Sequence, residues 1–197
     1  AVSGAKEIKM LGLDGIYAQM LGENIPSVRG LNQAFGSAYI PGPWMQSIQV
    51  TKGTGSVVNG FESITGQINT EFKKPQNAEK LFVNLFLNQD VRTELNLYAN
   101  QILKKKKQWS FGEYIHTQLN WLKMDLNKDG FIDNPLVKQL NYMQRATYMN
   151  NKNFMFITAA NLTLEERKGG QMLFDFHKDL IDQTYWGMSL KTKRFDW

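Results

Sequence analysis

Long runs of alternating apolar and polar residues are the feature that most restricts the fold of this chain. Successive residues of a β-strand point to opposite sides, so residues 108–121 divide between two faces. One face carries Trp109, Phe111, Ile115, Thr117, Leu119 and Trp121, and the other carries Ser110, Gly112, Tyr114, His116, Gln118 and Asn120. Glu113 interrupts the apolar face. Residues 154–165 alternate in the same way, which predicts a second strand of this kind.

The length of these strands favours a membrane-spanning β-barrel. Soluble β-sandwiches also alternate, but their strands usually have only about 5–6 residues. Trp109 and Trp121 lie on one face twelve positions apart, which spans roughly 28 Å along a membrane normal at ~3.3 Å per residue and ~45° tilt. The sequence contains no run of about 18 apolar residues, so a membrane-spanning helix is excluded. We predict strands at 80–88, 92–103, 108–121, 136–149, 153–166 and 184–197.

The connections between these strands alternate in length. Residues 104–108 and 150–153 form short connections, whereas 122–135 and 167–183 are long. Tight turns at one rim and long loops at the other are typical of a membrane barrel. We interpret the lysines at 104–107 as a solvated turn.

Residues 1–75 have a different sequence pattern from the rest of the chain. Glycines and turn dipeptides recur throughout this region, and short apolar alternations occur at 45–50 and 66–72. Such a pattern predicts a small mixed domain with short strands and tight loops. The pattern changes after residues 73–77, which we take as the boundary between two regions, 1–75 and 76–197.

Composition excludes several functions. The 197 residues include no cysteine and two histidines, so disulfides, thiolate chemistry and a histidine-rich metal site are not expected. The net charge of +5 is diffuse, and no basic stripe with interleaved aromatic residues predicts nucleic-acid binding. No catalytic constellation is visible around His116 or His177, so we do not expect an enzyme.

Residues 125–133, "DLNKDGFID", have the spacing of a calcium loop. Asp125, Asn127, Asp129 and Asp133 would occupy ligand positions 1, 3, 5 and 9, Gly130 would supply the sharp turn, and the carbonyl of Phe131 would be the ligand at position 7. Position 12, usually a bidentate glutamate, is Leu136, so any Ca²⁺ would be held weakly. The alternative is an Asx-rich turn in which these side chains bond their own backbone.

Two stretches of the first region resemble the plug of TonB-dependent outer-membrane receptors. In "IKMLGLDGIYAQMLGENIP", Gly12 and Leu13 match the family pattern, Leu11 replaces its usual arginine, and residues 23–26 stand for its Asp-Gly turn. In "YIPGPWMQSIQVTKGTGSVVNGFESITGQINTEFKKP", the matching residues are Lys52, Gly53, Ser56, Gly60, Gly66, Ile68 and Asn69. The style of "YIPGPW" is similar to that of Bacteroidetes-type receptors.

This resemblance implies a partial all-β membrane fold. Residues 1–75 would be the C-terminal part of a small mixed α/β plug domain, and residues 76–197 would be about six N-terminal strands of the transmembrane β-barrel that surrounds it. The early plug and the TonB-contacting segment would precede Ala1. The connections 88–91, 122–135 and 167–183 would then lie outside the cell.

The resemblance also implies a function. We expect a receptor of the bacterial outer membrane, in contact with its lipid, that takes up a siderophore, cobalamin, another metal complex or an oligomer with energy supplied by TonB. A surface lipoprotein partner is an open alternative. A soluble calcium-dependent adhesion or glycan-binding β-domain is the second hypothesis; it accommodates the strands and the acidic loop but not the plug motifs.

Overall fold

The structure, a computed structural model, describes residues 8–60, 62–103, 108–150, 154–174 and 187–196. The chain divides into two compact units, Ala5–Ala78 and Glu79–Trp197, which we call the N-terminal unit and the long-sheet unit. The lysine run, residues 151–153 and residues 175–186 lie outside the described residues. Among the described residues, no helix is both long enough and apolar enough to cross a membrane.

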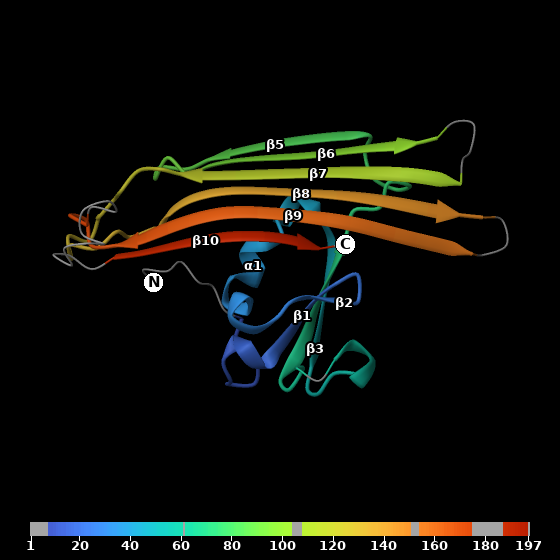
Figure 1. Ribbon diagram of the computed structural model, residues 1–197, viewed down its shortest axis with the longest axis horizontal. Helices are drawn as coiled ribbons and strands as arrows, with labels where there is room; N and C mark the ends of the chain where they lie inside the picture. Colours follow the sequence, from blue (N-terminus) through green and yellow to red (C-terminus); the bar gives the residue numbers. More distant parts are fainter. Residues whose placement is uncertain (1–7, 61, 104–107, 151–153, 175–186, 197) are drawn as a thin grey trace. The chain divides into compact units, whose positions relative to one another are not determined.

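The long-sheet unit is an open antiparallel sheet in which every strand pairs with its neighbours in sequence, in the order β10-β9-β8-β7-β6-β5 (Figure 1). Its strands are β5 (Leu81–Leu87), β6 (Thr93–Ile102), β7 (Trp109–Asn120), β8 (Leu136–Met149), β9 (Met155–Gly170) and β10 (Gly187–Asp196). All six predicted strands are therefore confirmed. Five of them, β6 to β10, have 10 to 16 residues, well above the usual strand length.

Strand β9 extends to Gly170, four residues beyond the predicted end. Charged side chains in this part of the strand pair across the sheet. Glu166 lies opposite Lys138 of β8 and Lys191 of β10, and its carboxylate is 3.0 Å from the Lys168 ammonium nitrogen. Because opposite charges on facing strands stabilise a sheet without any apolar pattern, the end of β9 could not be predicted from hydrophobic alternation.

The N-terminal unit is built around a four-stranded mixed sheet in the order β2-β1-β4-β3. The strands are β1 (Ala18–Gly22), β2 (Ile25–Val28), β3 (Met45–Lys52) and β4 (Gly66–Phe72), with β1 parallel to β4 and the other pairs antiparallel. The predicted strands at 45–50 and 66–72 correspond to β3 and β4. The short helical turns are η1 (Gly15–Tyr17), η2 (Gly30–Phe35), α1 (Gly36–Tyr39), η3 (Gly42–Trp44) and η4 (Val57–Asn59).

Backbone conformation explains the residue types at two positions of the plug-like motifs. Glu23 and Asn24, which stand for the family's Asp-Gly turn, have φ of 53° and 64° and join β1 to β2 as a tight two-residue hairpin of the kind that requires positive φ. Gly66 begins β4 where a Cβ would lie 2.4 Å from the Thr51 carbonyl oxygen. Only glycine allows that approach between β3 and β4.

The core of the N-terminal unit is small. Met10, Ala18 and Ile68 form one buried cluster, and Trp44 and Leu21 are each 2% exposed. A short buried network supports it: Gln67 donates to Gln19 (2.8 Å), whose own amide donates to the Asn59 carbonyl.

Candidate functional site

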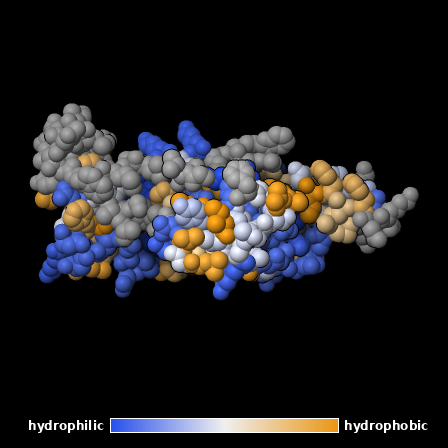
Figure 2. Space-filling view, turned by 90° about the horizontal axis from the view of Figure 1, so that it is seen from below, coloured by the Kyte–Doolittle hydropathy of each residue, from blue (hydrophilic) through white to orange (hydrophobic). Residues whose placement is uncertain are grey.

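The two faces of the long sheet differ in chemistry and exposure. On β7 the predicted alternation is confirmed: Ser110, Gly112, Tyr114, His116 and Asn120 are buried, whereas the apolar positions are partly or fully exposed. On β5, Leu81, Val83, Leu85 and Leu87 are all more than half exposed. Figure 2 shows apolar patches separated by hydrophilic side chains on one side of the molecule. The apolar face of the long-sheet unit is therefore largely exposed, which is unusual for a protein surface in water.

A row of polar residues crosses the hidden face of the sheet. Asn84, Asn96, His116, Asn141 and Thr163 lie directly opposite one another on β5 to β9. The Asn96 amide donates to Asn84 (3.3 Å), and His116 Nδ1 lies 2.7 Å from Asn96 Oδ1. The bonds within the row join Asn84, Asn96 and His116, whereas the buried Thr163 Oγ1 has no hydrogen-bond partner within the described residues. Because buried polar groups need partners, the row could contact a polar ligand or a polar protein surface.

Glu113, the exception on the apolar face, has two partners on β8. The Tyr142 hydroxyl donates to Glu113 Oε2, and Gln144 Nε2 donates to Glu113 Oε1 over 2.7 Å. Gln144 is directly opposite Glu113 in the register. The carboxylate is thus hydrogen-bonded within the sheet, which lowers the cost of placing a charge among apolar side chains.

Aromatic side chains gather at one end of the same apolar face. The Trp109 ring lies 5.0 Å from Tyr148 and 6.1 Å from Phe111, and Tyr148 lies 6.3 Å from Phe154, all between ring centroids. These residues adjoin the two short connections. Trp121, at the opposite end of β7, is 65% exposed.

The structure places Asp125, Asn127, Asp129, Phe131 and Asp133 together in the connection between β7 and β8. Their side chains accept hydrogen bonds from the loop backbone: Asp125 from the amides of Asp129 (3.2 Å) and Gly130 (2.9 Å), and Asp129 from that of Phe131 (2.8 Å). Asp133 accepts from the Leu126 amide over 2.7 Å. Gly130 has φ of 83°, as the predicted sharp turn requires.

These bonds are those of an Asx-rich turn. Within the described part of the chain, no three His, Cys, Asp or Glu side chains approach closely enough to hold a metal ion together. Backbone and side-chain oxygens of the loop could still contribute ligands, and calcium binding stays a prediction.

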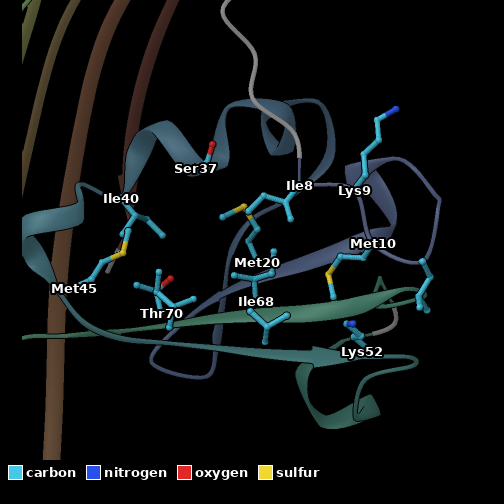
Figure 3. A pocket seen from close by; sticks show the side chains of 13 residues that line it. Ile8, Lys9, Met10, Met20, Ser37, Ile40, Met45, Lys52, Ile68 and Thr70 are labelled. Atoms are coloured by element: carbon cyan, nitrogen blue, oxygen red, sulfur yellow. The ribbon is translucent and has the colours of Figure 1, made fainter.

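A groove of about 640 Å³ lies in the N-terminal unit and was not predicted from the sequence. Figure 3 shows Met10, Met20 and Ile68 converging on it, with Ile40 and Met45 from the neighbouring segment. Its lining contains two lysines but no acidic residue or histidine. The groove can accept apolar groups. Its walls come from residues 8–11, β1, α1, β3 and β4, and no local pattern links segments so far apart in sequence.

Long antiparallel strands with one apolar and one polar face are typical of strands in outer-membrane proteins. A solved structure has a similar fold: the pyoverdine outer membrane receptor FpvA from Pseudomonas aeruginosa PAO1, bound to pyoverdine, with a TM-score of 0.60 and 18% sequence identity. The match covers 83% of this chain and 23% of that receptor, so this chain spans less than a quarter of its length.

No family model matches the sequence, and no curated protein matches it. The structural likeness therefore carries the comparison, and it confirms the expected receptor fold at a coarse level. The neighbour is a receptor.

Proposed function

We propose that this chain is part of an outer-membrane receptor that takes up a scarce nutrient with energy supplied by TonB. The observation that carries the proposal is the fold shared with a siderophore-bound outer-membrane receptor over 83% of the chain. Residues 1–75 are then the later part of the plug, and residues 76–197 are the first strands of the barrel around it.

The plug assignment is supported by how its motifs fold. Glu23-Asn24 makes the hairpin expected of the family's Asp-Gly turn, and Gly60 adopts φ of 113°, a conformation that L side chains rarely adopt. Gly66, Ile68 and Asn69 lie in the last strand of the unit. The style of "YIPGPW" favours a Bacteroidetes-type receptor.

The barrel assignment is supported by the apolar face of the long sheet. Its exposed leucines and valines on β5 suit contact with lipid, and the cluster around Trp109 and Tyr148 has the composition of an aromatic girdle at a membrane interface. The charged end of β9 lies at the other end of the strands, where a solvated rim would be expected. The hidden polar row then faces the lumen.

The ligand class follows from the family resemblance. A siderophore, cobalamin, another metal complex or an oligomer would be captured on the outer side, and TonB would act through a segment outside this chain. The outer-membrane lipid is a further partner, and a surface lipoprotein that caps the barrel is an additional candidate.

Fractionation of cells that produce the full-length protein tests this proposal. We expect the protein in the outer-membrane fraction, released by detergent and not by salt or alkaline washing, with faster migration on gels before heating than after. A protein that is fully soluble without detergent would overturn the proposal and favour the soluble calcium-dependent β-domain.

A further inference from the structure

The two long connections of the sheet are joined to each other. The first, residues 121–135, follows β7, and the second begins at Gln171, after β9. Both lie at the same end of the sheet, on the left of Figure 1, together with the β5–β6 turn. The described part of the second connection is residues 171–174, and every contact below belongs to it or to the first connection and the strand ends beside them.

Main-chain pairing links the two connections. Phe131 and Gln171 form an antiparallel bridge, with the Ile132 amide donating to the Gly170 carbonyl (2.9 Å) and the Met172 amide donating to the Gly130 carbonyl (2.8 Å). The pairing of β9 with β8 stops at Leu136. Beyond that point, the end of β9 pairs with the acidic loop, residues 125–133.

A lysine and two apolar side chains strengthen this link. Lys123 Nζ donates to the carbonyls of Met172 (3.2 Å) and Phe174 (2.9 Å), about fifty residues along the chain. Ile132 and Phe174 are each only 2% exposed, so apolar burial accompanies the polar contacts. A charged donor on two carbonyls makes a stronger contact than a neutral hydrogen bond.

A weaker contact extends the assembly to the first turn. Asn134 Nδ2 lies 3.4 Å from Asp90 Oδ2, and Asn88 Oδ1 accepts from the amides of Asp90 and Arg92 within that turn. Three connections at one end of the sheet are therefore linked.

We infer that residues 121–135 and 170–174 form one closed structural unit, the rim clasp, which closes the gap between the β7–β8 and β9–β10 connections and is held by the chain's own bonds without a bound ion. The clasp fixes residues 121–135 and 171–174 relative to each other at this end of the sheet. This inference goes beyond the proposed transport function and does not depend on the identity of the ligand.

Cysteine cross-linking tests closure directly, because the chain has no native cysteine. Phe131 and Gln171 occupy a non-hydrogen-bonded antiparallel position, for which a Cα separation of about 4.5 Å is usual and suits a disulfide. In the purified full-length protein, we expect Phe131→Cys/Gln171→Cys to oxidise almost completely under mild conditions. Leu126→Cys/Gln171→Cys is the control, since Leu126 is 66% exposed in the same loop, and it should cross-link poorly. Equal cross-linking of the two pairs would overturn the closed clasp.

Hydrogen exchange tests what holds the clasp. We expect Lys123→Met to speed amide exchange at Ile132 and Met172 about tenfold, whereas Lys128→Met, the same change at an exposed position of the loop, should leave both rates unchanged. The Ile132 and Met172 amides of the parent should already be protected in excess EDTA, because the bonds that hold the clasp need no ion. Protection that appears only with calcium, or an equal response to both lysine variants, would overturn the inference.

Discussion

At the scale of single residues, the face of the long sheet on which a side chain lies determines its surroundings. Ile115 and His116 are neighbours in sequence, yet one belongs to the exposed apolar face and the other is 4% exposed in the polar row. Glu113 shows that a charge on the apolar face needs partners on the next strand. The consequences of substitution should therefore depend on face and on depth along the strand.

We expect Ile115→Arg to destabilise the full-length protein by about 2–4 kcal/mol, because a cation near the middle of a lipid-facing strand is costly. Ile115 lies opposite Leu97 and Tyr142, near the middle of β7. Leu119→Arg, close to the end of the same strand, should cost only about 0–1 kcal/mol. Chemical unfolding from lipid vesicles measures both, and an Ile115→Arg variant as stable as the parent would show that the face is assigned wrongly.

We predict weak calcium binding by the acidic loop, with Asp125, Asn127, Asp129, Asp133 and the Phe131 carbonyl as ligands. The sharpest variant is Asp129→Asn, because an amide oxygen can still accept from the Phe131 amide while the charge is lost. Calorimetric titration of calcium into the full-length protein should give binding at roughly millimolar affinity, weakened in this variant. Identical isotherms for Asp129→Asn and the parent would leave only the Asx-rich turn.

At the scale of elements, two different features of the sequence produce strands. Some strands follow long stretches of alternating apolar and polar residues, and others depend on turn residues with positive φ or on a glycine. The strands of the long sheet are visible in the sequence because each one repeats apolar and polar residues over many positions. β1 and β2 have five and four residues, too few for periodicity to separate them from loop. Their hairpin depends on positive φ at Glu23 and Asn24, and β4 depends on glycine at its start.

We expect Gly66→Ala to destabilise the N-terminal unit by about 1–3 kcal/mol, since the new methyl group would meet the Thr51 carbonyl and the Met10 side chain at 2.4 Å and force a shift. Gly42→Ala is a matched control, because a methyl group there would have no neighbouring atom within 4 Å. Hydrogen exchange of β3 and β4 amides in the full-length protein distinguishes the two. Equal exchange in both variants would contradict the close approach of β3 and β4.

At the scale of the whole molecule, each of the two units leaves apolar surface exposed. The N-terminal unit has an apolar groove of about 640 Å³, and its edge strand β3 exposes Ile48 and Val50 by more than half. The long sheet exposes apolar side chains on β5 in the same way.

We predict that residues 1–78 expressed alone do not form a stable soluble monomer, because an exposed groove and an unpaired apolar edge favour association. Size-exclusion chromatography and binding of a hydrophobic dye should show aggregates or strong dye binding. A monomeric fragment with a sharp unfolding transition would contradict the prediction.

The sequence by itself determined the strand segments of the long sheet and the polar and apolar faces of β7, because these depend on periodicity within short windows. Only the tertiary structure revealed the polar row from Asn84 to Thr163, the groove and the rim clasp. Each of these depends on register between strands or on contacts such as Lys123 to Phe174, which lie about fifty residues apart. Alternation states which face a residue occupies, but it does not state which residue stands opposite, because that is set by pairing across the whole sheet.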